Sequence, residues 1–532
     1  MTTHRIAGVA RTGAFSGAVC AALLCVGAAQ AAGTLTYCSE YAPEGFDIAQ
    51  YETVGTGEAT IPIYDQLLGF VPGTTRLQPG LAQSWDVSAD GLVYTFRLRP
   101  GVKWHKTAWF TPTRDLDADD VVWSLRRMND KSHPGYAAAK NGWVYWAGMN
   151  MPALVKAIDK VDAMTVRVTL TKPEAPFLAD MAMSSLGTII PAEYAEQLAK
   201  AGKLDQLNTQ PVGSGPFIFR SYQKDATVRY TANPAYWGGA PKVDHLVFAI
   251  TVDPSVRVQR VKAGECMVAK LIPAGERDLA GDARVRVERS VPIRTAYVAP
   301  NAQRPYLSDP RFREALLLSI DKKNLIQAVY AGLAQPLATF LPASVWSHDA
   351  SLPERRDVER AKALVKASGY DGRELWLYTV SGRADNKRGA EVLQADWAAV
   401  GVKVGVRLME LGELYKRTGA GEHDLTFLSW FGDNGDPDNF FTPNLSCAAS
   451  VAGGNKAHWC SKPFDALIDE ARRTTDLAVR TRLYTQAQRL LYDDVGTIPI
   501  ATPVSLRAER SNVRGVIVLP FGHLDFRQAS ID

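Results

Sequence analysis

The stretch LWLYTV at residues 375–380 is short, apolar and rich in aromatic and β-branched side chains, as expected for a buried strand. Two similar stretches follow, VKVGVRL at residues 402–408 and LTFLSW at residues 425–430. Apolar residues at helical spacing fill the first gap and end at Gly401, and a shorter helical segment at residues 411–417 fills the second. The order strand, helix, strand, helix, strand predicts a parallel sheet with right-handed crossovers.

Sheets of this kind bind ligands in the loops at the carboxyl ends of their strands. Two such loops follow the predicted strands, at residues 381–388 and 432–439. The first contains Arg383 and the second contains Asp433. We therefore expect a ligand site at this edge of the sheet.

Strand and helix patterns are mixed through the rest of the chain, which indicates an α/β or α+β protein. Residues 92–98 alternate apolar and polar side chains and predict a half-buried strand. Asp117 is placed to cap a following helix, and Asp357 is placed to begin another that ends at Gly369.

The composition is that of an ordinary globular protein with room for two or three domains, with 532 residues of which 46% are hydrophobic and 22% charged. Sixty Lys and Arg against 56 Asp and Glu leave a net charge of +4 that is not gathered into a basic block. This balance argues against a nucleic-acid-binding surface. Six cysteines without CxxC or CxxH spacing exclude a small disulfide-rich fold and argue against a zinc ribbon.

The N-terminus is typical of a secretory signal peptide. Arg5 and Arg11 precede an apolar run at residues 14–29, and Ala29-Gln30-Ala31 fits a cleavage pattern. Neither cysteine of this run follows the small residue that lipid attachment requires, so soluble export is favoured over a lipid anchor. No later stretch approaches the ~18 uninterrupted apolar residues of a membrane span. We predict that residues 1–31 are removed and that the mature protein is periplasmic.

Ordered motifs across almost the whole mature chain resemble those of a known family. They are residues 37–40 (YCSE), 43–46 (PEGF), 79–85 (PGLAQSW), 94–99 (YTFRLR), 101–105 (GVKWH), 118–122 (ADDVV), 213–217 (GSGPF), 236–238 (YWG), 309–322 and 432–441 (GDNGDPDNFF). Together they are similar to the extracytoplasmic solute-binding proteins of family 5, the peptide and nickel receptors of ABC importers. The dipeptide-binding branch is the most similar.

The resemblance implies an α/β fold of two lobes, a type II, cluster C periplasmic binding protein with an extra domain on the N-terminal lobe. The expected parts are signal peptide 1–31, lobe I 32–65, 213–292 and 504–532, extra domain II 66–212, and lobe II (domain III) 293–503. The lobes are expected to close about a hinge on di- or short peptides, as a monomeric receptor for an ABC permease and its ATPase subunits. No cofactor, metal or nucleic acid is expected. Relatives that take up haem, nickel chelates, opines or cationic antimicrobial peptides provide the alternatives.

Recognition of a free peptide requires one group for its ammonium and one for its carboxylate, at a fixed separation. Asp433 matches the aspartate with which the dipeptide-binding branch holds the α-ammonium of its ligand. Composition alone would instead make Asp433 the cap of a turn in its Asp-, Asn- and Gly-rich loop. Trp430, just before it, either walls the pocket or fills the core.

For the ligand carboxylate the branch uses an arginine after the preceding strand, where this chain has Arg383. The loop is slightly shorter than the family form, so Lys387 and Arg388 are alternatives, and Arg383 could instead be a solvated surface side chain. A guanidinium holds a carboxylate with two hydrogen bonds, which a lysine cannot do. Strand-like hydrogen bonds to the peptide backbone are expected from the main chain of Ser39, Tyr41 and Ala42.

Four cysteines remain after residue 31, and export favours their pairing in disulfides, with three possible connectivities. Cys447 and Cys460 are close in sequence and suit a local bond, which leaves Cys38 with Cys266, and the resemblance implies the same pairing. A zinc site built on His458 and Cys460 is the alternative, but two thiols and one histidine are too few for a structural site.

An exported hydrolase is the alternative class of function. Ser214 stands in Val-Gly-Ser-Gly, which lacks the first glycine of a nucleophile elbow, and no HExxH or P-loop motif occurs. The acidic run at residues 433–438 has Gly435 and Pro437 where calcium ligands would be needed. The sequence therefore favours a binding protein over an enzyme.

Overall fold

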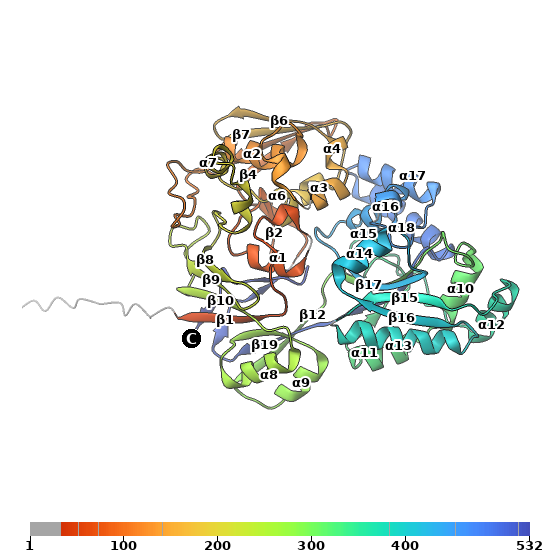
Figure 1. Ribbon diagram of the computed structural model, residues 1–532. Coiled ribbons are helices and arrows are strands. Elements are labelled where there is room, and N and C mark those ends of the chain that lie inside the picture. The colour runs from red at the N-terminus through yellow and green to blue at the C-terminus, as the bar shows by residue number, and fades with distance from the viewer. Residues whose placement is uncertain are drawn as a thin grey trace, which may run out of the picture.

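The computed structural model of the chain describes residues 33–51, 53–72, 74–140, 142–381, 383–452, 454–519 and 521–532. The predicted signal peptide, residues 1–31, lies outside them. Figure 1 shows a body that contains the N-terminal strand and the yellow-green strands, beside a body of cyan and blue elements, with an orange domain above the first. Among the described residues, no helix combines the length and the apolar character that a membrane crossing needs.

The first lobe is built on a sheet to which seven strands of the described chain belong. In spatial order they are β12 (Val285–Ser290), β19 (Ser505–Arg510), β11 (Val268–Leu271), β1 (Thr34–Ser39), β10 (His245–Ile250), β9 (Thr227–Ala232) and β8 (Phe217–Gln223). Helices α8 (Pro254–Ala263) and α9 (Pro273–Leu279) pack on it through Val258, Val261 and Leu279. Strands from the beginning, the middle and the end of the chain therefore share this sheet.

The second lobe contains the predicted parallel strands. Its sheet has the order β14 (Ala334–Pro336), β18 (Ile498–Pro503), β13 (Arg294–Pro300), β17 (Leu425–Phe431), β15 (Leu375–Val380) and β16 (Val404–Met409). β15 is parallel to both β16 and β17, which confirms the parallel arrangement. β13 pairs antiparallel with β17, so the sheet as a whole is mixed.

Helices cover both faces of this second sheet. They are α10 (Pro310–Ser319), α11 (Lys322–Tyr330), α12 (Val358–Ala367), α13 (Ala384–Ala398), α14 (Leu411–Gly419), α15 (Asp438–Leu445), α16 (Cys447–Ala452), α17 (Lys462–Arg473) and α18 (Leu477–Asp493). Asp357 caps α12 by accepting a hydrogen bond from the Arg360 N–H, as predicted. Trp397 of α13 is fully buried in the core of the lobe and donates a hydrogen bond to the carbonyl oxygen of Leu316 (3.1 Å).

The predicted loop at residues 381–388 is shorter than expected, because α13 begins at Ala384. Residues 384–388 contain no glycine or proline, so nothing in them stops a helix. Asp385 lies in the first turn, where the partial positive charge of the helix N-terminus favours an acid. Lys387 and Arg388 therefore lie on a helix rather than in a loop.

The extra domain has its own antiparallel sheet, in the order β4 (Ala82–Val87), β5 (Val93–Leu98), β7 (Thr165–Leu170) and β6 (Val155–Asp162). β5 confirms the strand predicted at residues 92–98. Asp117 caps α2 (Ala118–Asn129) as predicted, since its carboxylate accepts from the Asp119 N–H (2.9 Å). Trp123 of α2 packs in the core of the first lobe, so the domain is attached to that lobe.

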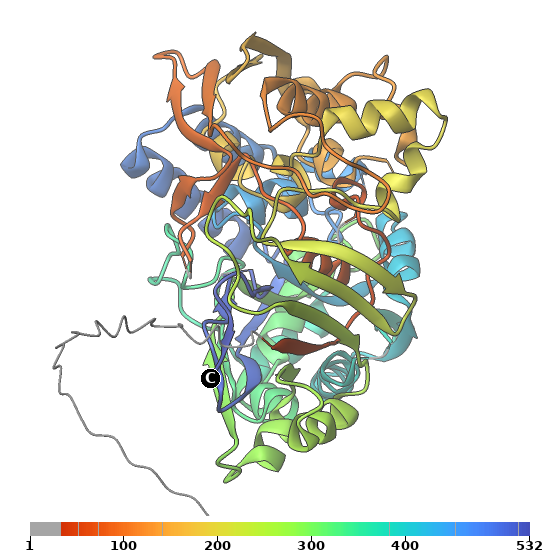
Figure 2. The ribbon, with the colours of Figure 1, turned by 90° about the vertical axis from the view of Figure 1, so that its left-hand side faces the viewer.

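Shorter elements complete the described chain around these sheets. They are α1 (Val54–Thr60), α3 (Val144–Gly148), α4 (Met151–Leu154), α5 (Phe177–Asp180), α6 (Ser184–Gly187), α7 (Ala192–Lys200), the ribbon of β2 (Leu68–Phe70) and β3 (Leu77–Pro79), and the C-terminal strands β20 (Val513–Arg514), β21 (Ile517–Val518), β22 (Leu524–Asp525) and β23 (Ser530–Ile531). In Figure 2 the extra domain lies above the strands of the first lobe, and the C-terminal strands (blue) lie beside them.

The chain passes from the first lobe to the second between β12 and β13, and it returns between β18 and β19. Both connections are short. Short connections at the ends of strands can absorb the backbone rotations of a hinge.

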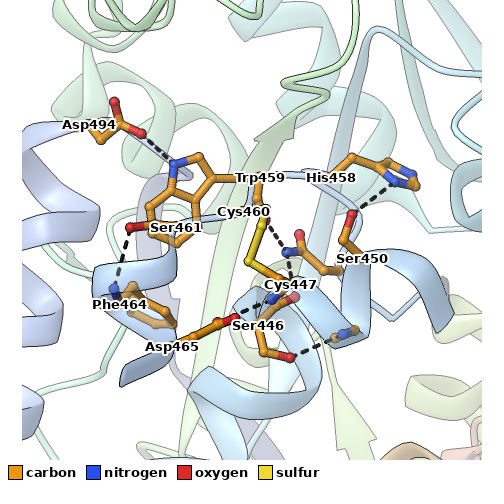
Figure 3. The surroundings of a disulfide bond; sticks show 12 residues. Ser446, Cys447, Ser450, His458, Trp459, Cys460, Ser461, Phe464, Asp465 and Asp494 are labelled. Atoms are coloured by element: carbon orange, nitrogen blue, oxygen red, sulfur yellow. Dashed lines mark hydrogen bonds between the residues drawn. A yellow bond between two sulfur atoms is a disulfide. The ribbon is translucent and has the colours of Figure 1, made fainter. Parts of the chain in front are cut away.

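Two disulfide bonds join the pairs that the sequence favoured. Cys38 of β1 is bonded to Cys266, and Cys447 of α16 is bonded to Cys460, just before α17. Figure 3 shows the second bond between these helices, next to Trp459, whose indole N–H donates to Asp494. Because Cys460 is in a disulfide, the alternative of a zinc site on this cysteine is wrong.

Candidate ligand-binding site

Asp433 lies between β17 and α15, at the carboxyl end of β17. Its main-chain N–H donates to Asn439 Oδ1 (2.9 Å), which fixes the loop. Its Oδ2 accepts a hydrogen bond from the hydroxyl of Tyr145 (3.1 Å), a residue of α3 in the extra domain. The half-buried carboxylate is therefore held in place and is chemically suited to accept further hydrogen bonds from an ammonium group.

The loop that carries Asp433 is pressed against the extra domain. Gly435 has a φ of +69°, and a Cβ built on it would lie 2.3 Å from the Cβ of Thr75. A larger residue at this position would be strained and would clash. Next to it, Asn434 Nδ2 donates to Asp180 Oδ1 (2.7 Å). Asp433 thus lies where the second lobe meets the extra domain.

Trp430 is half-buried near the end of β17 and packs against the core of the second lobe. Its indole Nε1 is buried and has no hydrogen-bond partner among the described residues. A buried indole N–H usually has a partner, so a ligand acceptor could satisfy it. Trp430 thus packs on the core of the second lobe and has an indole N–H that can donate to a ligand.

Arg383 is the N-cap residue of α13 and follows β15. Since β15 and β17 are hydrogen-bonded parallel neighbours, Arg383 and Asp433 follow adjacent strands at one edge of the sheet. Arg383 Nη1 donates to the Tyr41 hydroxyl of the first lobe (3.2 Å). Arg388, by contrast, has a side chain 58% exposed and pairs with Glu391 (3.4 Å). Arg383 thus reaches the first lobe, whereas Arg388 pairs with an acid of its own helix.

The end of β1 supplies the first lobe's part of the site. The Ser39 hydroxyl is buried and donates to the carbonyl oxygen of Tyr41 (2.9 Å). It also accepts a hydrogen bond from the Tyr41 N–H (3.4 Å), so this main-chain N–H already has a partner. Tyr41 and Ala42 are half-buried, and Gly55 of α1 approaches the Ala42 carbonyl so closely that a Cβ there would lie 2.4 Å away.

Arg383 is not the sole guanidinium here. Its Nε and Nη2 donate to the two carboxylate oxygens of Asp385 (3.3 and 3.1 Å). On the other side, Arg294 Nη2 lies 3.7 Å from Asp385 Oδ2. Burial alone would raise the pKa of Asp385, but Arg383 and Arg294 outweigh it and hold that pKa below its usual value. Asp385 is therefore ionised at neutral pH.

A second charged cluster joins the extra domain to the second lobe. Arg472 of α17 donates to Glu174 of the extra domain (2.5 Å) and lies 3.7 Å from Asp438. Burial raises the pKa of Glu174 to about 7 despite Arg472, and Asp438 adds to the rise. Burial also raises the pKa of Asp180 well above its ordinary range. These carboxylates are among the most deeply buried in the described chain.

The arrangement offers an acid and a base for a ligand with two opposite charges. Within the described residues, no group of three His, Cys, Asp or Glu side chains is arranged to hold a metal ion. Charged ends of a ligand bound between lobes, where water is excluded, would interact more strongly with these side chains than in bulk water.

The chain is a member of the bacterial extracellular solute-binding proteins, family 5, because the model of that family (family 5 Middle) matches residues 76–451. Its fold is the two-lobed type II fold of the periplasmic peptide-binding proteins, with the extra domain on the first lobe. The resemblance inferred from the sequence motifs is thereby confirmed.

Individual relatives agree over nearly the whole length. Di/tripeptide-binding protein 4 of Pseudomonas aeruginosa (strain UCBPP-PA14) is 47% identical over 523 residues, which cover 97% of this chain and 98% of that protein. Di/tripeptide-binding protein 2 of the same strain is 45% identical and covers 94% and 95%. The crystal structure of a dipeptide binding protein from Pseudoalteromonas sp. SM9913 in complex with Met-Leu has 32% identity and a TM-score of 0.88, over 94% of this chain and 100% of that one.

Three residues at the site were not predicted from the sequence: Tyr145, Asp385 and Arg294. Tyr145 belongs to the aromatic stretch WVYW at residues 143–146, which is a signal, but nothing in it indicates a contact with Asp433. Asp385 lies two positions from Arg383 and could have been suspected as its ion-pair partner. Arg294 gives no local sequence signal, because its place depends on the pairing of β13 with β17.

Proposed function

We propose that this protein is the periplasmic substrate-binding component of an ABC importer and captures dipeptides and other short peptides for a membrane permease and its ATPase subunits. The observation that carries the proposal is the pair of opposite charges, Asp433 and Arg383, at the ends of adjacent strands. Relatives named for di- or tripeptide binding, similar along their whole length, support this ligand class.

In the proposed complex, Asp433 binds the α-ammonium of the peptide and Arg383 binds its carboxylate. Trp430 forms part of the pocket wall. The main chain of Ser39, Tyr41 and Ala42 contributes hydrogen bonds to the peptide backbone, at Tyr41 through the carbonyl oxygen, which can accept a second bond, because the N–H is bonded to Ser39. Affinity then depends on the charged ends and the backbone, so the receptor accepts many side chains.

The proposed division of the chain follows the sheets. Lobe I comprises residues 32–65, 213–292 and 504–532, the extra domain residues 66–212, and lobe II residues 293–503. Ligand contacts both lobes and shifts the population toward the closed form, which the permease selects. One chain supplies both lobes, so we propose a monomer, exported after removal of residues 1–31, that binds without chemical turnover.

Two measurements test this function. Mass spectrometry of small molecules released by denaturing the purified protein identifies its natural ligand, and we expect di- or tripeptides. Titration calorimetry then compares peptides of increasing length with haem and a nickel chelate. Binding of haem or the nickel chelate without binding of peptides would overturn the proposal, and cleavage of a bound peptide would reassign the protein to the hydrolases.

A further inference from the structure

Asp385 lies between two guanidinium groups. Arg383 donates to both of its oxygens (3.3 and 3.1 Å), and Arg294 Nη2 is 3.7 Å from the oxygen Oδ2. The side chains of Arg383 and Asp385 remain 33% and 25% exposed, whereas that of Arg294 is 10% exposed. Two positive groups therefore share a single carboxylate within a partly open part of the site.

Arg294 is the less well satisfied of the two arginines. It donates one hydrogen bond to the Ser429 hydroxyl (2.9 Å) and stacks over the ring of Phe431 (4.9 Å). Its Nε is buried and has no hydrogen-bond partner among the described residues. Within the described chain, Asp385 is the carboxylate that lies within ion-pair distance of the Arg294 guanidinium. A buried cation requires such a partner.

The ionisation of the three groups follows from their neighbours. Burial lowers the pKa of Arg294, and the charge of Arg383 lowers it further. Burial would also lower the pKa of Arg383, but Tyr41 and Asp385 outweigh it and raise that pKa above its ordinary value. All three side chains are therefore charged at neutral pH, and together they carry one net positive charge.

Other charges near Tyr41 are matched within the first lobe. Glu40 pairs with Arg257 (2.8 Å), and Lys270 pairs with Glu58. Glu40 also helps to raise the pKa of Arg383, but its ion pair is with Arg257. Asp385 is the carboxylate that accepts hydrogen bonds from Arg383. One ligand carboxylate neutralises the net positive charge of Arg383, Arg294 and Asp385. A second ligand carboxylate nearby would be repelled by the negative charge of Asp385.

Building on the proposed function, in which Arg383 binds the peptide carboxylate, we propose that Asp385 is a specificity-determining residue that limits this end of the site to one ligand carboxylate. Asp385 accepts hydrogen bonds from Nε and Nη2 of Arg383 and neutralises the charge of one guanidinium. Peptides that end in Asp or Glu then bind more weakly than the corresponding peptides that end in Asn or Gln. Discrimination of this kind uses repulsion of the wrong ligand as well as attraction of the right one.

The test compares Ala-Glu with Ala-Gln, which have nearly the same shape and differ by one charge. Titration calorimetry gives the ratio of their Kd values for the wild type and for Asp385→Asn. We expect the variant to lower the ratio Kd(Ala-Glu)/Kd(Ala-Gln) by about five-fold or more, because two guanidiniums then face the ligand. A ratio that stays the same in this variant would overturn the proposal.

A matched control removes an acid from the same helix outside the site. Glu391 of α13 has a side chain 43% exposed and pairs with Arg388 at 3.4 Å. Glu391→Gln changes the net charge of the protein as Asp385→Asn does, and we expect it to leave the ratio unchanged. An equal effect of both variants would assign the change to overall charge and overturn a specific role for Asp385.

A second variant keeps the proposal testable if Asp385→Asn does not fold. Arg294→Gln leaves Asp385 paired with Arg383 alone, and we expect it to raise the ratio above that of the wild type. A lowered or unchanged ratio in this variant would contradict the proposed charge balance. If the wild type binds neither peptide, the proposed function fails as well. If it binds both peptides but the Kd ratio is the same in the wild type and the variants, this inference alone is overturned.

Discussion

Replacing Asp433 by asparagine keeps the size of the side chain and removes its charge. The hydrogen bond from Tyr145 can survive this change, because the amide oxygen still accepts. A charge-assisted bond to the ligand ammonium is worth ~1.5–3 kcal/mol, so we expect Asp433→Asn to weaken dipeptide binding about ten-fold or more. An N-acetylated dipeptide, which lacks the ammonium, provides the control. Unchanged affinity for the free dipeptide in calorimetry would remove Asp433 from the site.

Arg383→Ala tests the other end of the ligand. We expect the variant to lose about ten-fold or more in affinity for dipeptides and much less for their C-terminal amides, which have no carboxylate. Arg388→Ala on the same helix is the matched control, because that side chain is exposed and pairs with Glu391. Equal losses on peptide and amide would show that Arg383 does not contact the carboxylate.

Part of the site could be predicted at the residue scale. The loops that carry Arg383 and Asp433 were accessible because each follows an apolar strand of the parallel sheet, whereas the role expected of each side chain came from the family resemblance. Tyr145 was not accessible, since it approaches Asp433 from a separate domain 288 residues away in sequence. Arg294 depends on a strand pairing that no local pattern determines.

At the scale of elements, the contact between α17 and the extra domain predicts a pH dependence. Burial raises the pKa of Glu174 to about 7 in the docked arrangement, whereas a solvated carboxyl titrates near ~4.3. Formation of the contact between α17 and the extra domain therefore takes up a proton when the pH lies between these two pKa values. It is favoured at lower pH and weakens as the pH rises through about 7.

If ligand release separates these elements, dipeptide affinity follows the same direction. We expect the Kd to rise by up to about ten-fold between pH 6 and pH 8. Glu174→Gln, which stays neutral at every pH, should reduce this dependence, leaving the part that belongs to Asp180 at the same contact, and Glu391→Gln should retain all of it. A wild-type Kd that is constant over this range would contradict the coupling.

The elements of the second lobe were predicted closely where local patterns determine them. β15 and β17 match their apolar stretches to within one residue, and α14 contains the predicted helix. α13 begins at Ala384, within the predicted loop at residues 381–388, because the apolar residues that indicated this helix lie further along it, whereas its first turn is polar. β13 and β18 join this sheet through contacts between distant segments, which periodicity cannot reveal.

At the scale of the whole molecule, the two connections between the lobes predict closure on the ligand. Tyr41 of the first lobe and Arg383 of the second are already joined by a hydrogen bond (3.2 Å), so the lobes are in contact at the site. We expect small-angle scattering to show a smaller radius of gyration after a dipeptide is added. Scattering curves that coincide with and without peptide would contradict a hinge mechanism.

In the proposed function, the protein recognises the two charged ends of a short peptide. Titration calorimetry of the purified wild-type protein tests it most directly, with one dipeptide in three forms: free, N-acetylated and C-amidated. We expect tight binding of the free form and about ten-fold or greater loss of affinity for each blocked form. Equal affinity for all three forms would contradict it.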